Sequence, residues 1–324
     1  MPKATAIAHP NIAFIKYWGD ADPELRIPVN GSISMNLGSL HSRTTVEFDP
    51  GLALDELTIN GRPPGDIALQ RVARFMDHVR NLADCKTFAH ITSENNFPMG
   101  SGIASSASGF AALSLAASTA AGLELDRIDL SRLARRGSGS ACRSVPTGFV
   151  EWYSGQDDAT SYAESIAGAD YWNLRDCIAI VNRAHKETGS LAGHSLAGSS
   201  LLQEARVRDA PRRLSLCRQA ILERDFQSFA EIVELDSNLM HAVMMTSQPQ
   251  LVYWQPATLA VMQSVVEMRS GGMQVCFTID AGPNVHVITI DEYSTSVAKK
   301  LEHIPGVNEV LASSPGEGTR LIEN

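Results

Sequence analysis

Apolar side chains recur at steps of three and four residues in the stretch IALQRVARFMDHVRNLA, residues 67 to 83. Charged residues occupy the positions between them, as on the solvent side of a surface helix. The apolar positions that share one helical face are Leu69, Val72, Phe75, Met76, Val79 and Leu82. The pattern predicts an amphipathic helix over these residues.

A second helix is predicted to begin near Ala104, where serines can cap its first turn, and to stop at Gly122. Short runs of β-branched and aromatic residues predict strands instead. These runs are RTTVEF (43 to 48), FAHIT (88 to 92) and CIAIVN (177 to 182). The first half of the chain therefore mixes helices and strands, and no internal repeat interrupts it.

The pattern changes after residue 183, where the polar stretch HKETGSLAGHSLAGSS (185 to 200) precedes a long helical region. We place a domain boundary there, giving domains 1–185 and 186–324. The second domain is predicted as helix, helix, strand, strand, helix, with strands at 273–279 and 285–290, the turn DAGPN between them and a closing helix at 291–304. Helices laid on an antiparallel sheet make an α+β fold.

Composition excludes several classes of function. The 324 residues carry 27 Lys and Arg against 36 Asp and Glu, a formal charge of −9, which disfavours a nucleic-acid partner. Five cysteines form no CxxC pair, as expected in a reducing compartment, and no zinc spacing occurs among the nine histidines. No apolar run of about 18 residues is present. We therefore expect a soluble, cytoplasmic protein without a membrane partner.

The stretch NNFPMGSGIASSASGFAALSLAA (95 to 117) combines glycines and serines just before a helix. Small residues at a helix N-terminus let an anion approach unpaired backbone N–H groups, so a phosphate chain fits this site. No lysine follows the glycines, so the stretch is not a Walker A loop. Close packing of the helix against a sheet is the alternative explanation for the small residues.

Four motifs, in this order along the chain, closely resemble those of the mevalonate diphosphate decarboxylases of the GHMP kinase superfamily. They are NIAFIKYWGD (11 to 20), PMGSGIASSASG (98 to 109), RRGSGSACRS with GFVEW (135 to 152), and FTIDAGPNV (277 to 285). The resemblance implies a ribosomal protein S5 domain 2-like N-terminal domain and a ferredoxin-like C-terminal domain. It also implies ATP with Mg²⁺, a phosphorylated mevalonate as substrate, and a homodimer.

The resemblance implies three catalytic residues. Asp280 matches the family's catalytic carboxylate, which accepts or orients the proton of the substrate's 3-hydroxyl. Lys16 would keep that carboxylate ionised and steady the transferred phosphoryl group. Arg143 has the planar fork suited to the carboxylate that leaves as CO₂. Each residue also has a structural alternative. Asp280 could stabilise its own turn, Lys16 could be a solvated surface lysine, and Arg143 could form an interdomain ion pair.

Binding residues follow from the same motifs. The substrate-binding set is Asn11, Tyr17, Ser138, Gly139, Ser140 and Arg143, together with positions Asp20 and Leu191. The nucleotide set is Asn96, Gly100, Ser101, Gly102, Ser105 and Ser106, and helix capping is the alternative role for the serines. Metal ligands are not assigned by the motifs. Trp18 and Trp152 are predicted to pack in the core.

Two positions depart from the family pattern. Where the family has a lysine that contacts the terminal phosphate of the substrate, this chain has Asp20. Where many members have an arginine directed at the diphosphate, the comparable stretch GSLAGH (189 to 194) has Leu191. Loss of two charge-assisted contacts, each about 1.5 to 3 kcal/mol, would weaken diphosphate binding, and a carboxylate would repel the terminal phosphate.

The departures predict a substrate with one phosphate fewer, mevalonate 5-phosphate, converted to isopentenyl phosphate with release of ADP, phosphate and CO₂. Three alternatives remain open at this point. The chain could decarboxylate mevalonate 5-diphosphate with other cations in place of the missing pair. It could stop as a kinase at the 3-phosphorylated intermediate, or serve as a non-catalytic ligand sensor.

Overall fold

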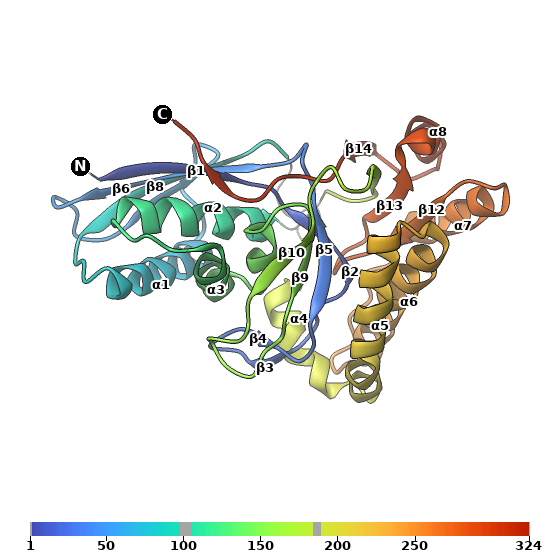
Figure 1. The fold of residues 1–324 in the computed structure, drawn as a ribbon, viewed down its shortest axis with the longest axis horizontal. Coiled ribbons are helices and arrows are strands. Elements are labelled where there is room, and N and C mark those ends of the chain that lie inside the picture. Colours follow the sequence, from blue (N-terminus) through green and yellow to red (C-terminus); the bar gives the residue numbers. More distant parts are fainter. Residues whose placement is uncertain (1, 98–104, 184–188, 324) are drawn as a thin grey trace.

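The structure is a computed structural model, which describes residues 2–97, 105–183 and 189–323, except for the side chains of 190 and 191. Three sheets follow one another along the long axis of the molecule, and the N- and C-termini lie at the same end (Figure 1). Helices flank the two outer sheets. The middle sheet lies between these two outer parts.

The first sheet has the strand order β15-β1-β6-β8-β7. Its strands are β1 (Lys3–Ala8), β6 (Ser42–Asp49), β7 (Glu56–Ile59), β8 (Phe88–Asn95) and β15 (Arg320–Leu321). Helices α1 (Asp66–Leu82), α2 (Ser105–Ala120) and α3 (Arg127–Gly137) share one hydrophobic core with it. Alanines of β1 face alanines of α2 across this core, which lets the helix lie close to the sheet. The small residues in the body of α2 thus serve packing.

The middle sheet has the order β10-β9-β5-β2. Its strands are β2 (Asn11–Ile15), β5 (Ser32–Asn36), β9 (Phe149–Trp152) and β10 (Ala163–Ala167). All five residues of β2 are buried. A 3-10 helix at Gly139–Ser144 packs against this sheet, and a small hairpin of β3 (Asp20–Asp22) and β4 (Ile27–Pro28) extends from it.

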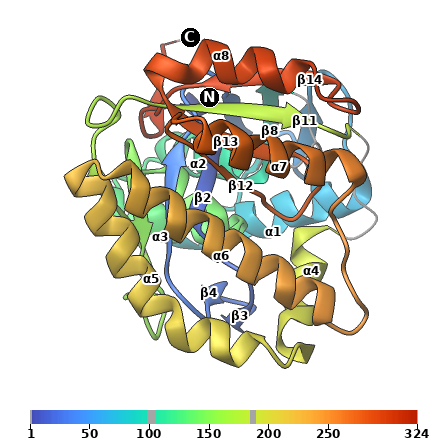
Figure 2. The same cartoon turned by 90° about the vertical axis from the view of Figure 1, so that its right-hand side faces the viewer.

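The third sheet has the order β12-β13-β11-β14 and is antiparallel throughout. Its strands are β11 (Leu174–Ile180), β12 (Val275–Thr278), β13 (Val285–Ile290) and β14 (Glu309–Ser313). One face packs on α7 (Pro256–Ser270) and α8 (Asp291–Glu302). The other face shares a core with α5 (Gln203–Glu223), α6 (Phe226–Thr246) and the middle sheet. Both helices contact β2, and Figure 2 shows α5 and α6 on the face of the molecule turned toward the viewer.

Most predicted elements are confirmed. Helix α1 buries Val72, Phe75, Met76 and Val79 as expected, but Leu82 in its last turn is 52% exposed. Helix α2 ends before Gly122, whose φ of +78° lies in the left-handed region that glycine tolerates without strain. The long helical region divides into two helices, and the polar stretch before it contains α4 (Ser190–Leu196) and a 3-10 turn (Ala197–Ser199).

Strand β11 precedes the boundary predicted at residue 185, yet it pairs with β13 and β14 of the C-terminal sheet. At the other end, β15 returns to pair with β1 of the first sheet. Strand partners are chosen by tertiary packing, which composition along the chain does not report. By strand pairing, β11 belongs to the C-terminal sheet although it precedes residue 185, and β15 belongs to the first sheet although it follows residue 186. The domain limits 1–185 and 186–324 remain a prediction.

Candidate active site

Lys16 and Asp280 meet where the middle sheet abuts the C-terminal sheet. Lys16 follows β2, and Asp280 lies in the turn between β12 and β13. Lys16 Nζ donates to Asp280 Oδ1 at 2.6 Å, with the lysine side chain 1% exposed and the carboxylate 26% exposed. Burial lowers the pKa of Lys16 below 10.5, and the charges of Asp280 and Asp236 oppose that shift. The site therefore opens on the carboxylate side of the pair.

The backbone of Lys16 is held from two helices of the C-terminal half. Asp236 of α6 accepts the Lys16 N–H at 2.8 Å and an N–H of Arg213 at 2.7 Å. Arg206 of α5 donates to the Lys16 carbonyl at 2.7 Å. All three side chains are buried. None of them lies in one of the four motifs, and their signal in the sequence is a charged residue on a helix face with apolar neighbours.

His241 lies behind the same pair. Its Nε2 is 3.3 Å from the carbonyl oxygen of Ile279, next to Asp280 in the chain, and its ring packs on Trp254. Burial lowers the pKa of His241 to about 4, and the nearby Lys16 ammonium adds to the shift. The imidazole is therefore neutral at physiological pH. It adds no charge next to Lys16.

Arg143 is oriented by Asn11 and Ser32. Its Nε and one terminal nitrogen donate to Asn11 Oδ1 at 3.2 and 3.1 Å, and the other terminal nitrogen donates to Ser32 Oγ at 2.5 Å. The Asn11 amide nitrogen donates to Ser140 O and Ser144 Oγ. Both groups of the Asn11 amide are thus occupied. Asn11 therefore positions Arg143, and its place in the substrate-binding set stays a prediction.

Asp280 is close enough to Arg143 for its negative charge to raise the pKa of the guanidinium, although burial lowers that pKa overall. Arg143 also lies over the ring of Trp152, 5.9 Å from its centroid. Trp18 and Trp152 are both buried, as predicted. The three predicted catalytic residues therefore come from three distant segments and converge on one site.

Ser138, Gly139 and Ser140 connect α3 to the 3-10 helix. A Cβ on Gly139 would lie 2.6 Å from the Tyr17 ring, so only glycine allows this close approach. Ser138 Oγ is 3.3 Å from Ser106 Oγ in the first turn of α2. This contact links the predicted substrate segment to the predicted nucleotide segment.

The hydroxyl of Tyr17 donates to Asp20 Oδ1 at short range. Burial raises the pKa of Asp20 above 3.8, opposed by the Tyr17 hydrogen bond and the charge of Arg26. Burial also raises the pKa of Tyr17 well above 10, and Asp20 adds to this. His194 of α4 packs on the Tyr17 ring and accepts the Gly19 N–H at 3.0 Å. Asp20 is thus part of the site, turned toward Tyr17.

A cavity of about 820 Å³ lies beside the N-terminus of α2, and Ser105, Ser106 and Arg71 are among its lining residues. Its volume is within the range of small-molecule and cofactor sites. Arg71 donates twice to Gly137 O, at 3.1 and 2.9 Å, and stacks on Phe110. Burial lowers the pKa of Arg71 to about 10, with Arg26 contributing. The sequence alone does not single out this cation, because α1 carries several arginines at similar spacing.

Of the remaining predicted nucleotide-binding residues, the structure describes only Asn96. Gly100, Ser101 and Gly102 lie outside the described residues. Asn96 does not line the cavity, since its amide donates to Ser39 O and accepts the His41 N–H, whereas the adjacent Asn95 does line it. The side chain of Leu191, within α4, also lies outside the described part.

Residues 2–97, 105–183 and 189–323 contain no helix with the length and apolar character needed to cross a membrane. Within the same ranges, no three His, Cys, Asp or Glu side chains gather as a ready-made metal site.

Comparisons with known proteins agree with this geometry. Residues 8–163 match the family described as "Diphosphomevalonate decarboxylase-like N-terminal domain", and residues 177–318 match "Mevalonate 5-diphosphate decarboxylase C-terminal domain". The chain is 37% identical to the diphosphomevalonate decarboxylase of Aspergillus fumigatus, over 94% of this chain and 81% of that protein. It is also 37% identical to the phosphomevalonate decarboxylase of Haloferax volcanii, over 90% of this chain and 89% of that protein.

Solved structures give the same result. The crystal structure of mevalonate diphosphate decarboxylase from Staphylococcus aureus superposes with a TM-score of 0.95 at 36% identity, covering 99% of this chain and 98% of that one. A structure described as "MDDEF in complex with MVAPP, AMPPCP and Magnesium" has a TM-score of 0.93 at 37% identity, covering 99% of both chains. These likenesses confirm the predicted α+β GHMP kinase fold.

Proposed function

This chain belongs to the mevalonate diphosphate decarboxylase family, and from that premise we propose that it is an ATP-dependent decarboxylase of mevalonate 5-phosphate. The reaction converts mevalonate 5-phosphate and ATP to isopentenyl phosphate, ADP, phosphate and CO₂. Relatives named for the monophosphate and for the diphosphate are equally similar to this chain at 37% identity. The substrate assignment therefore depends on the residues at the phosphate end of the site.

The cavity at α2 fits a nucleotide. Apolar side chains such as Leu57, Ile59 and Val72 line one part of it, which suits a base, and Arg71 with Ser105 and Ser106 supplies a cation and hydroxyls for phosphates. Mg²⁺ bound with ATP keeps several waters and phosphate oxygens, so it needs few protein ligands. ATP with Mg²⁺ supplies the phosphoryl group that makes the 3-oxygen of the substrate a leaving group.

Asp280 is the group that orients the substrate's 3-hydroxyl and accepts its proton. Lys16 holds the carboxylate from the buried side at 2.6 Å, and it stabilises the ionised form of Asp280 by direct charge contact. The same ammonium places positive charge where negative charge accumulates on the transferred phosphoryl group. The backbone of Lys16 is held in this position by Asp236, which accepts its N–H, and by Arg206, which donates to its carbonyl. Arg213 in turn pairs with Asp236 and keeps that carboxylate in place.

Arg143 binds the carboxylate that departs as CO₂. The electron pair of the bond between carbon 2 and the carboxylate forms the double bond between carbons 2 and 3, while the phosphate leaves carbon 3. The bond to the carboxylate must therefore be aligned with the bond between carbon 3 and the leaving oxygen. Hydrogen bonds to Asn11 and Ser32 fix the plane of the guanidinium and provide this alignment. Ser138, Gly139 and Ser140 bind the 5-phosphate end with hydroxyl and backbone donors.

One observation carries the monophosphate assignment: the Asp20 carboxylate accepts a hydrogen bond from the Tyr17 hydroxyl, and the Tyr17 ring lies against Gly139 of the predicted substrate-binding set. Tyr17 contacts Gly139, so a second phosphate beyond the first would extend toward a negative charge. A carboxylate in place of a cation both removes an attraction and adds a repulsion. A 5-phosphate ends before that region.

The test is turnover of the purified protein on both substrates, followed as ADP and CO₂ release. We expect kcat/KM to be at least about ten-fold higher for mevalonate 5-phosphate than for mevalonate 5-diphosphate. A preference for the diphosphate would overturn the assignment in favour of the ordinary family reaction. ADP release with a stable 3-phosphorylated product and no CO₂ would identify a kinase, and no ADP release with either substrate would leave a ligand sensor.

A further inference from the structure

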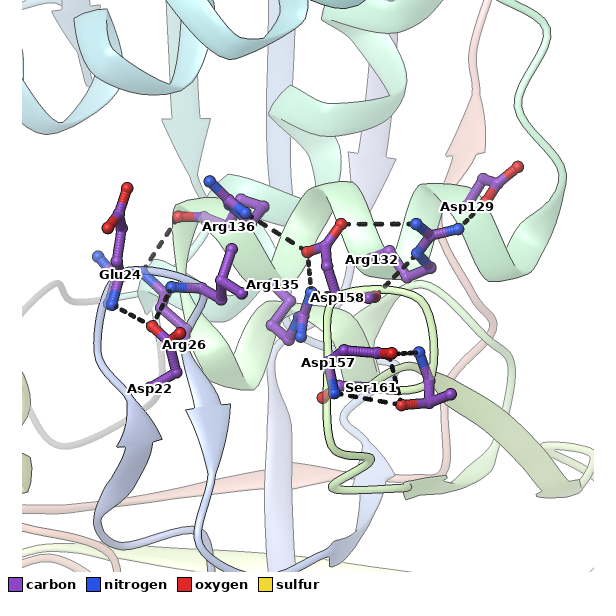
Figure 3. A network of polar contacts seen from close by, with 12 residues as sticks. Asp22, Glu24, Arg26, Asp129, Arg132, Arg135, Arg136, Asp157, Asp158 and Ser161 are labelled. Carbon is purple, nitrogen blue, oxygen red and sulfur yellow. Dashed lines mark hydrogen bonds and ion pairs between the residues drawn. The ribbon is translucent and has the colours of Figure 1, made fainter.

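Arg26 is held in an unusual backbone conformation beside the proposed substrate site. It lies in the turn between β3 and β4 with φ at +53°, a region that non-glycine residues rarely occupy. Its Nε donates to the carbonyl oxygen of Arg136 at 3.1 Å, near the end of α3 (Figure 3). Such conformations persist where the surrounding structure imposes them, and they often occur at ligand sites.

Arg26 differs from Arg132, Arg135 and Arg136 in having no carboxylate partner among the described residues. Arg132, Arg135 and Arg136 all pair with Asp158, which lies across from α3 in Figure 3. Arg26 forms no ion pair with any described residue, and within that part of the chain only its Nε has a hydrogen-bond partner. Its two terminal nitrogens are therefore available to an anion from outside the protein.

The Arg26 side chain is directed by its anchor toward the substrate segment. The carbonyl that it contacts belongs to Arg136, and Ser138 and Gly139 follow within three positions. Across the hairpin, Asp20 pairs with Pro28 and bonds Tyr17, whose ring touches Gly139. The positive charge of Arg26 also acts to lower the pKa values of Tyr17, Asp20 and His194, as expected for a cation near all three.

We propose that Arg26 binds the 5-phosphate of the substrate, in a site that lacks the terminal-phosphate cations of the family at positions 20 and 191, an inference that rests on the proposed function. An arginine anchored through Nε still presents two N–H groups in one plane, which match two oxygens of a phosphate. Asp20, on the neighbouring strand, then limits the site to one phosphate. Together the two residues determine specificity for the shorter substrate.

Arg26→Gln tests this directly. The glutamine keeps the length of the side chain and removes the cation, so KM for mevalonate 5-phosphate should rise about ten-fold or more while kcat changes less than about three-fold. Arg26→Lys keeps the charge without the planar fork, so its KM for mevalonate 5-phosphate should lie between those of the wild type and Arg26→Gln. Arg132→Gln is the matched control, because it removes a nearby arginine that is already paired with Asp158 and should leave KM within two-fold.

Binding of mevalonate 5-phosphate without nucleotide, measured by calorimetry, gives a second readout that does not depend on turnover. Unchanged affinity and KM in a folded Arg26→Gln protein would overturn the role of Arg26, whichever substrate the wild type prefers. Weaker binding of the diphosphate by Arg26→Gln, in a wild type that prefers the diphosphate, would support the phosphate contact. That outcome would overturn only the substrate assignment.

Discussion

Lys16 Nζ lies 2.6 Å from Asp280 Oδ1, although the two residues are 264 positions apart. The lysine is 1% exposed and the carboxylate 26% exposed, so of the two side chains it is Asp280 that a bound molecule can reach. This relationship assigns different work to the two residues. In the proposed function Asp280 contacts the substrate, and Lys16 sets the charge around it.

Asp280→Asn should abolish most turnover. Asparagine keeps the shape of the side chain but neither accepts a proton nor carries a charge, so kcat should fall about 10²- to 10⁴-fold. KM should stay within a few-fold, because most binding contacts remain. Steady-state ADP release measures both constants, and a near-normal kcat would remove Asp280 from the mechanism.

Arg143→Lys should lower kcat/KM for the preferred substrate about 100-fold or more. A lysine ammonium cannot bond Asn11 and Ser32 while also holding the two oxygens of a carboxylate. Arg132→Lys, on α3 outside this site, is the matched control and should behave like wild type. Equal kinetics for the two variants would show that Arg143 is a structural residue.

Asp20→Asn should shift the substrate preference toward the diphosphate. The amide oxygen can still accept the Tyr17 hydroxyl, so the substitution removes the negative charge with little change in geometry. We expect the ratio of kcat/KM for the diphosphate to that for the monophosphate to rise about ten-fold, and further with Asp20→Lys.

Measurements of the Asp20 variants at several salt concentrations separate a local contact from general attraction of anions, since long-range attraction weakens most with added salt. A ratio that does not move in either variant would mean that Asp20 does not act on the substrate. The basis of the monophosphate assignment would then be lost.

Asp236→Ala should destabilise the protein by about 3 kcal/mol, because it removes the fully buried carboxylate that pairs with Arg213 and leaves that guanidinium with the partly exposed Asp209 as its carboxylate partner. Both side chains are 0% exposed. The double variant Asp236→Leu with Arg213→Met removes both charges and should recover part of the loss. Urea unfolding measures the free energies, and a loss under 1 kcal/mol in the single variant would contradict the prediction.

His241 should make the protein less stable as the pH falls below 6.5. Its pKa is about 4 in the folded protein and 6.5 as an ordinary value, so between these values the unfolded chain binds more protons. Stability therefore rises with pH across this window, by up to about 1.4 kcal/mol per pH unit from this group. His241→Gln should flatten the pH profile of unfolding, whereas His303→Gln, at an exposed ring, should leave it unchanged.

Local patterns in the sequence predicted five of the strands (β6, β8, β11, β12 and β13) and the helices α1, α2, α5, α6 and α8, because periodicity and helix-ending residues act over a few positions. Helix α1 and the end of α2 at Gly122 are examples. The pairing of β11 with the C-terminal sheet was not predictable in this way, since it joins residues more than 100 positions apart. The partner of a strand depends on which faces pack together.

The sequence by itself determined which chemical groups the site contains, because Lys16, Arg143 and Asp280 each lie in a short motif that is readable without its neighbours. Only the tertiary structure decided how those groups are used. It placed Asn11 behind Arg143, Asp236 beneath Lys16 and Arg26 beside Tyr17 and Asp20. Such roles follow from the packing of α5, α6 and the β3–β4 hairpin against the middle sheet. An arginine or aspartate on a helix or turn has the same local pattern whether it faces solvent or supports an active site.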